Sequence, residues 1–483
     1  MSETTTPETP HAHVTPQESE TALDNRGSLN SDFVIFVRER IDNDDHNEVR
    51  RVVGELRPAD IADLIEQLGN EHVPNFLKIV GNALPSETLA ELDESAREVV
   101  IDALPTEQLA EAVAELDTDE AAFVLEELDE EDRADVLAEV PIADRLALQS
   151  ALDYGEDTAG RMMQRDVFAA PGYWNVGQII DRLRSVERLP ETFYDVYVVD
   201  PGYKVLGIVP LSQFIKAKRD TVVQDLIVPD PILIDAVMDQ EEVAYLFEKY
   251  NLISAPVVDD SHRLVGMITV DDVVEVVHEE ADEDMLALGG VTVDDNSVNV
   301  SVRKLARSRF VWLFVNLGTA ILASVVIGLF DGTIEQMVAL AVLMPIVASM
   351  GGNAGTQTMT VTVRNLSTRS LTAANMLRTV ARETAVSALN GVAFAVILGM
   401  AAGIWYHILV GAPTAEASAL SMVLAAAMIV TMVCAGLAGI LVPVGLERFG
   451  QDPAVSSSVF VTTVTDVVGF FAFLGLAAMF LVG

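Results

Sequence analysis

Five long apolar segments in the second half of the chain constrain its fold most strongly. They cover residues 311–330, 337–363, 385–410, 419–446 and 454–482. Each is long enough to cross a bilayer, which takes about 20 residues in a helix. Backbone polar groups in lipid must be satisfied within the segment itself, so such stretches predict membrane-spanning helices. We therefore expect an α-helical transmembrane bundle of five spans over residues 301–483.

The basic residues between these segments predict their orientation. Arginines and lysines precede the first segment, separate the second from the third, and follow the fourth; they are Arg303, Lys304, Arg307, Arg309, Arg364, Arg369, Arg378, Arg382 and Arg448. The other two connections carry neither residue type. Basic loops stay on the cytoplasmic side. We expect a multi-pass protein of the plasma (inner) membrane, with the N-terminus cytoplasmic and the C-terminus outside.

The net charge of the chain limits the classes of ligand that it can bind. The 483 residues carry 73 acidic and 30 basic side chains, a net charge of −43, and most of the acids precede residue 300. Such an acidic surface argues against nucleic acid as a ligand, because nucleic acid is bound mainly through Lys and Arg side chains. A single cysteine, Cys434, excludes a disulfide within the chain, so cations that prefer oxygen ligands are the natural partners. Residues 1–30 are polar, lack the apolar core of a signal peptide, and are expected to form a disordered tail.

The acidic half predicts two kinds of domain. Residues 31–153 place Leu, Val and Ala at helical spacing with Asp and Glu between them, which predicts an all-α superhelical domain. Residues 154–275 hold two copies of one pattern, VYVVDPGYKVLGIVPLSQFI and APVVDDSHRLVGMITVDDVVEVV. Each copy predicts two strands and a helix, hence a paired α/β module. The acids of the helical domain are also compatible with a simple solvated face. An acidic connecting helix is expected over residues 276–300.

The second span contains the unusual cluster GGNAGTQ, from Gly351 to Gln357. Glycines weaken a helix, and Asn353 and Gln357 are costly against lipid. Two interpretations are open at this stage. The small residues could serve close helix packing. Alternatively, the helix opens locally and exposes carbonyl oxygens to a hard cation, with Gly351, Gly352, Asn353 and Gln357 lining a pore.

The fifth span carries an acid, Asp466, about midway along its length. An Asp at the centre of a membrane helix costs roughly 2.5–3.5 kcal/mol on insertion scales, so it predicts a function. Thr462 and Thr463 lie one turn earlier on the same side and are expected to line a pore with it. Asp452 lies about four turns earlier, at the mouth. The structural alternatives are a hydrogen bond from Asp466 to a neighbouring helix, and helix capping by Asp452.

One carboxylate in each chain supplies little charge for a divalent ion in a medium of low dielectric. Two carboxylates related by a two-fold axis would supply enough. Two-fold dimers are the commonest closed assembly, so we expect a homodimer with its pore at or near the subunit interface.

On these residues the chain resembles the MgtE family of magnesium transporters along nearly its whole length after the tail. The motifs that carry the resemblance are YGEDTAGRMM at residues 154–163, GGNAGTQ at 351–357, and DPAV followed by FVTTVTD, which ends at Asp466. The resemblance implies a helical N-domain, two CBS motifs, a connecting helix and a homodimeric Mg²⁺ channel in the lipid bilayer. It also implies that Asp466 forms the central ion site with backbone carbonyls, and that Asp452 lies at the cytoplasmic end.

The resemblance further implies that intracellular Mg²⁺ holds the pore closed by bridging acids of the N-domain, the CBS pair and the connecting helix. By position, the metal ligands of this sensor would be Asp272, Glu275, Glu280, Glu283 and Asp284. Simple electrostatics agrees with this scheme. Crowded carboxylates repel one another in a compact state, and divalent cations neutralise them.

CBS motifs often bind adenine nucleotides through a Thr/Ser-x-x-Asp sequence. The second copy has this sequence in Thr269 and Asp272, which makes ATP a candidate ligand there. In the first copy, Gln213 stands where the acid is expected, which weakens the case for ATP as a modulator.

Two alternatives to a Mg²⁺ channel follow from the same residues. Another divalent cation, such as Mn²⁺ or Co²⁺, could use the oxygens, although Mg²⁺ best suits a site with few direct ligands because it keeps its waters. The chain could also be a CBS-controlled membrane receptor that conducts nothing. An enzyme is not expected, since the sequence offers no nucleophile paired with a base, no phosphate loop and no zinc motif.

Overall fold

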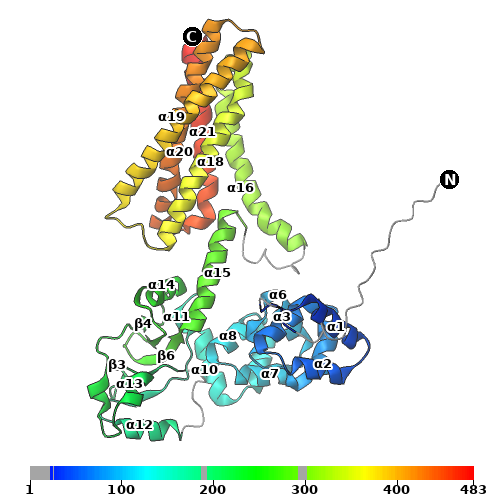
Figure 1. Cartoon of the computed structure of the whole chain (residues 1–483), viewed down its shortest axis with the longest axis vertical. Coiled ribbons are helices and arrows are strands. Elements are labelled where there is room, and N and C mark those ends of the chain that lie inside the picture. The colour runs from blue at the N-terminus through cyan, green and yellow to red at the C-terminus, as the bar shows by residue number, and fades with distance from the viewer. Residues whose placement is uncertain (1–21, 25–26, 186–192, 292–301, 483) are drawn as a thin grey trace, which may run out of the picture. The chain divides into compact units, whose positions relative to one another are not determined.

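The computed structural model describes residues 22–24, 27–185, 193–291 and 302–482 (Figure 1). It divides into two compact units, residues 1–277 and 278–483, which we describe separately. Most of the expected tail over residues 1–30 lies outside the described residues, as do residues 292–300 of the expected connecting helix. Leu29, however, is buried in the first hydrophobic core, so ordered structure begins before the boundary expected at Ser31.

The first unit begins with a domain made of short helices, as the sequence predicts. These are α1 (Ser31–Asp42), α2 (His46–Val53), α3 (Pro58–Leu68), α4 (Val73–Val80), η1 (Gly81–Ala83), α5 (Thr88–Glu91), α6 (Glu94–Ala103), α7 (Thr106–Glu115), α8 (Thr118–Glu126), α9 (Glu130–Glu139) and α10 (Ile142–Leu152). Aspartates stand before several of them. Asp93 accepts a hydrogen bond of 2.7 Å from the Ala96 backbone N–H, and Asp129 accepts two such bonds in front of α9. These side chains satisfy N–H groups that a helix start leaves unpaired.

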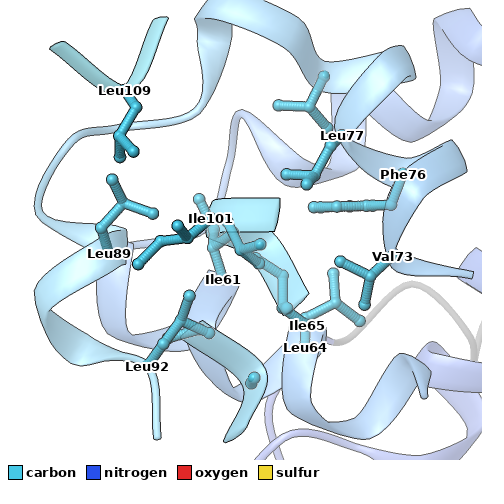
Figure 2. Close-up of a cluster of buried hydrophobic side chains, with 14 of the residues drawn as sticks. Ile61, Leu64, Ile65, Val73, Phe76, Leu77, Leu89, Leu92, Ile101 and Leu109 are labelled. Carbon is cyan, nitrogen blue, oxygen red and sulfur yellow. The ribbon is translucent and has the colours of Figure 1, made fainter. Parts of the chain in front are cut away.

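One apolar core joins these helices (Figure 2). Ile61, Leu64 and Ile65 of α3 and Phe76 of α4 are each less than 2% exposed. Burying one such side chain contributes roughly 1.5–3 kcal/mol before entropy is counted. Packing between helices, rather than the propensity of any single short helix, therefore holds the domain together.

Two three-stranded sheets follow and have the same topology. The first contains β1 (Ala169–Pro171), β2 (Asp195–Val199) and β3 (Val205–Pro210), and the second contains β4 (Ile234–Asp235), β5 (Ser254–Val258) and β6 (Leu264–Thr269). In each, the first pair is parallel and the second antiparallel. The register shifts at the same place, between Val198 and Val199 and between Val257 and Val258. The helical segments of the pair are α11 (Ala159–Met162), α12 (Val176–Leu183), α13 (Leu211–Lys216), η2 (Val223–Leu226) and α14 (Gln240–Tyr250).

The turns of the two hairpins, β2–β3 and β5–β6, contain the same kind of hydrogen bond. Asp200 Oδ1 accepts hydrogen bonds from the Gly202 and Lys204 N–H groups, and Asp259 Oδ1 accepts them from Ser261 and Arg263. Such side-chain bonds to the backbone two residues ahead are the reason that Asp favours turns. The predicted pair of related α/β copies is therefore confirmed.

The helix α15 (Val270–Leu288) begins at the end of the first unit and ends in the second. The second unit continues with α16 (Val302–Gly328), α17 (Asp331–Gln336), α18 (Ala339–Ser367), α19 (Met376–Ile408), α20 (Thr414–Arg448), α21 (Pro453–Ala477) and η4 (Ala478–Val482). Five of its helices are long and apolar enough to cross a membrane, as expected. Among them, α20 is the most buried and packs against α18, α19 and α21 (Figure 1).

The helix α18 runs without interruption from Ala339 to Ser367 and so passes through the GGNAGTQ cluster. The interpretation that the helix opens there is therefore wrong for this structure. The glycines serve close packing instead. A Cβ on Gly439 of α20 would lie 2.7 Å from the Gly355 carbonyl oxygen of α18, so the two backbones approach more closely than side chains would allow.

Candidate functional site

The fifth span presents Asp466 as a half-buried side chain. Its carboxylate forms no hydrogen bond or ion pair with any other described residue, so the alternative of a structural bond to a neighbouring helix is wrong within this chain. Thr462 donates to the Ser458 carbonyl at 2.8 Å and Thr463 to the Val459 carbonyl at 2.6 Å. Their hydrogens are thus used within α21, and each hydroxyl oxygen keeps lone pairs for another partner.

The GGNAGTQ cluster is split between two faces of α18. Gly351 and Gly355 are buried, and a Cβ on Gly351 would lie 2.6 Å from Thr431 Cγ2 of α20. A Cβ on Gly355 would lie 2.7 Å from Val461 Cγ1 of α21. This placement is that of packing residues, and the pore-lining role of Gly351 stays a prediction. Gly352 is half-buried, with no atom within 4 Å of its would-be Cβ.

Asn353 and Gln357 are exposed on another face of α18, where they line a cavity of about 470 Å³. The structure brings them together with Glu383, Ser387 and Asn390 of α19, which our sequence analysis missed. The signal was present, because Ser387 and Asn390 lie inside the third apolar segment and continue the helical spacing that begins at Glu383, just before it. Asp466 is not among the residues that line this cavity.

The end of α15 lies beside the start of α21. Ser367, the last residue of α18, donates a hydrogen bond of 2.7 Å to Asp284 Oδ2. Burial raises the pKa of Asp284 above its ordinary value, the Ser367 hydrogen bond opposes the rise, and the nearby Asp452 carboxylate adds to it. Asp452 also caps α21, accepting from the Ala454 N–H at 2.7 Å. The capping interpretation of Asp452 is thus confirmed, and its carboxylate lies close enough to Asp284 for the two to repel.

In the first unit, acids of the helical domain face the start of α15. Asp272 Oδ2 accepts hydrogen bonds from the Thr269 N–H at 3.1 Å and the Thr269 hydroxyl at 2.9 Å. Burial raises the pKa of Asp272 to about 6. Burial, and then the Asp272 carboxylate, raise the pKa of Asp119 well above its ordinary value, and Asp119 Oδ1 is buried without a hydrogen-bond partner among the described residues.

Further acids surround this pair. Burial, and then Asp117, raise the pKa of Glu120 to about 7. Burial, and then Glu91, raise the pKa of Glu275, while Arg97 opposes that rise. The acids of the helical domain could not be chosen from the sequence, because that region offers many equivalent carboxylates. On the later part of α15, Glu280 is half-buried and Glu283 is exposed.

No group of three or more His, Cys, Asp or Glu side chains converges closely enough to hold a metal ion within the described part of the chain. The acids form pairs, Asp119 with Asp272 and Asp284 with Asp452, rather than closed ligand sets.

Comparison with known proteins identifies the family. Residues 344–476 match a family model described as a divalent cation transporter, residues 56–157 match the MgtE intracellular N domain, and residues 223–279 match a CBS domain. The magnesium transporter MgtE of Bacillus subtilis (strain 168) is 30% identical over 438 residues, which cover 90% of this chain and 94% of that protein. The chain belongs to the MgtE family of magnesium transporters. The magnesium transporter MgtE of Thermus thermophilus is also 30% identical, over 93% of this chain and 98% of that protein.

A solved structure described as the cytosolic domain of the Mg²⁺ channel MgtE in complex with ATP is 30% identical to this MgtE chain. The match covers 50% of this chain and 99% of the chain in that structure, with a TM-score of 0.47. Membership of the MgtE family makes the chain a multi-pass membrane protein of a magnesium-transporting family.

Proposed function

We propose that this protein is a Mg²⁺-selective channel or transporter for Mg²⁺ uptake, closed by Mg²⁺ on its cytoplasmic side. The observation that carries the conducting role is Asp466, a carboxylate in the middle of a span with no partner among the described residues. An acid in the middle of a membrane helix is costly, so it persists where it serves a cation. Mg²⁺ dehydrates reluctantly, and a site with one carboxylate and threonine oxygens suits an ion that keeps its waters.

The proposed working unit is a homodimer in the lipid bilayer. One Asp466 in each chain supplies a single negative charge, whereas two related by a two-fold axis match the charge of Mg²⁺. Within one chain, Asp466 lies on a half-buried part of α21 and is not enclosed by other acids. A second copy facing α21 would complete the site.

The proposed sensor is the pair of Asp119 and Asp272, with Glu120 and Glu275 beside it. Four carboxylates held near one another repel, and their raised pKa values express the cost of that repulsion together with the cost of burial. A divalent cation removes this cost, so cytoplasmic Mg²⁺ would favour the state in which the acids are close.

The proposed gate is the second pair, Asp284 with Asp452. Ser367 ties Asp284 to the end of α18, and Ala287 of α15 packs against Met359 and Val363. With Mg²⁺ between the two carboxylates, the end of α15 would stay docked beside the start of α21. Glu280 and Glu283 would add to the negative potential that attracts the ion.

This proposal assigns residues 31–153 to the sensor domain, 154–275 to the CBS pair, 276–300 to the connecting segment and 301–483 to the pore domain. The basic connections support a cytoplasmic location for the first of these domains and an outside location for the C-terminus. A nucleotide bound at the second CBS copy would share Asp272 with the sensor, since Thr269 and Asp272 form the expected nucleotide motif and Asp272 Oδ2 accepts hydrogen bonds from Thr269.

Mg²⁺ influx into proteoliposomes tests the proposal. Wild type and Asp466→Asn are compared at low and high Mg²⁺ on the cytoplasmic face, with Mn²⁺ and Co²⁺ as competing ions. Glu335→Gln, in the short helix α17 outside the span, is the matched charge control. We expect influx in wild type and in the control, suppression by cytoplasmic Mg²⁺, and loss of influx in Asp466→Asn. A wild type that conducts nothing at low Mg²⁺ would favour a receptor, and an active Asp466→Asn variant would remove Asp466 from the ion path.

A further inference from the structure

The cavity between α18, α19 and α20 has the character of a cation site. Its volume is about 470 Å³. A water molecule occupies about 30 Å³ of liquid, so the six waters around a Mg²⁺ ion would take roughly 180 Å³. The cavity therefore has room for the ion with its complete first hydration shell.

The lining offers oxygen atoms whose hydrogen-bonding capacity is unused. Asn353 and Gln357 of α18 and Ser387 and Asn390 of α19 form no side-chain hydrogen bonds with the other described residues. Ser387 is only 5% exposed. Polar side chains at the depth of a membrane span are costly unless protein or water satisfies them. Four of them at one cavity point to a hydrated occupant.

One acid, Glu383, supplies charge. Its side chain is 15% exposed, and Arg382 contacts its Oε1 at 2.9 Å. The described residues form no hydrogen bond to Oε2, which leaves that oxygen for the cavity. Met350, Phe394 and Met432 complete the lining. They provide the apolar part of the lining.

We infer that this cavity binds a hydrated divalent cation through Glu383, Asn390, Ser387, Asn353 and Gln357, at a site separate from Asp466. The residues would hold the waters of the ion rather than the ion itself, since amides and a hydroxyl are good partners for bound water. This inference rests on the proposed function for the identity of the ion. The cavity would be a second cation-binding site in the membrane unit, lined by α18 and α19 rather than by α21.

Iron-mediated cleavage of the full chain in detergent tests the inference. Fe²⁺ replaces Mg²⁺ at the sites, ascorbate and hydrogen peroxide generate hydroxyl radicals there, and mass spectrometry maps the broken peptide bonds. We expect cleavage near Gln357 and between Glu383 and Asn390, suppressed by excess Mg²⁺. This cleavage should be lost in Glu383→Gln and in Asn390→Leu. It should persist in Glu447→Gln and Asn316→Leu, two matched controls that do not line the cavity.

Asp466→Asn separates this inference from the proposed function. That variant should lose cleavage near Asp466 and keep cleavage in α18 and α19. Cleavage near Asp466 alone would overturn the inference and leave the proposed function standing. Cleavage in α19 that excess Mg²⁺ does not suppress, but added phospholipid does, would also overturn it and identify a lipid headgroup as the occupant. In the wild type, cleavage in α18 and α19 without any cleavage near Asp466 would count against the proposed function.

Discussion

The hydroxyl of Ser367 donates a hydrogen bond of 2.7 Å to Asp284 Oδ2 and so connects the end of α18 to the acidic helix α15. Asp284 lies near Asp452, whose charge helps to raise the pKa of Asp284. A neutral donor and a second carboxylate thus act on the same side chain in opposite directions. The hydroxyl favours docking of α15, whereas the carboxylate opposes it until a cation is present.

Ser367→Ala should therefore weaken closure. A hydrogen bond to a charged group contributes about 1.5–3 kcal/mol, and partial exposure of this bond favours the lower end. Since about 1.4 kcal/mol corresponds to tenfold, suppression of influx should need on the order of tenfold more cytoplasmic Mg²⁺. Dose–response curves in proteoliposomes measure this shift. Thr368→Ala is the control, because the Thr368 hydroxyl bonds to the Arg364 carbonyl of its own helix. Equal curves for Ser367→Ala and wild type would refute the docking role.

The sensor acids predict a pH dependence. Glu120 has an ordinary pKa of 4.5 and a folded pKa of about 7, and the pKa of Asp272 is raised to about 6. A carboxyl group whose pKa is raised in the folded state stabilises that state at low pH. This stabilisation is lost as the pH rises through the pKa of the folded state. Without Mg²⁺, the contact between α8 and α15 should thus weaken between about pH 5 and pH 8, by an amount on the order of 2 kcal/mol. Hydrogen exchange of residues 118–126, corrected for intrinsic rates, measures this change.

Mg²⁺ should reverse that loss, and more so at about pH 8 than at about pH 5, because it binds deprotonated carboxylates. Asp119→Asn should flatten both dependences, since it removes a buried acid that the Asp272 carboxylate repels. Asp102→Asn, at an exposed acid of α6, is the matched control. An unchanged pH profile in Asp119→Asn would show that the acid pair does not control this contact.

Gly439→Ala should destabilise the membrane unit. The added Cβ would lie 2.7 Å from the Gly355 carbonyl oxygen and 2.8 Å from Thr358 Cβ, so α18 and α20 must separate. Overpacking of this kind costs about 1–3 kcal/mol. Gly445→Ala on the same helix meets no atom within 4 Å and should be neutral or slightly stabilising. Thermal unfolding in detergent compares the two variants, and equal melting temperatures would contradict the close approach.

Ser254→Ala should weaken the CBS pair. Ser254 donates to Asp195 Oδ2 at 2.7 Å and accepts from the Tyr197 hydroxyl at 3.4 Å, and so joins β5 to β2. Its removal leaves the half-buried Asp195 carboxylate without its donor, which costs about 1–3 kcal/mol. The stability of the first unit towards urea measures this loss. Ser261→Ala, in an exposed turn, should change little, and an equal loss in both variants would argue against the network.

The sequence by itself determined the features that depend on local order. Hydropathy placed the five spans, because insertion into a bilayer depends on the residues of each segment alone. Repetition placed the two α/β copies, and isolation in an apolar stretch singled out Asp466.

The tertiary structure decided which residues meet. It placed Gly351 and Gly355 against α20 and α21, and Asn353 and Gln357 beside Glu383 and α19. It also selected Asp119 among many similar acids as the neighbour of Asp272. The physical reason is that the rotation and spacing of packed helices depend on how their side chains fit together. That fit is a property of two segments far apart in the chain, and the pattern within either segment does not contain it.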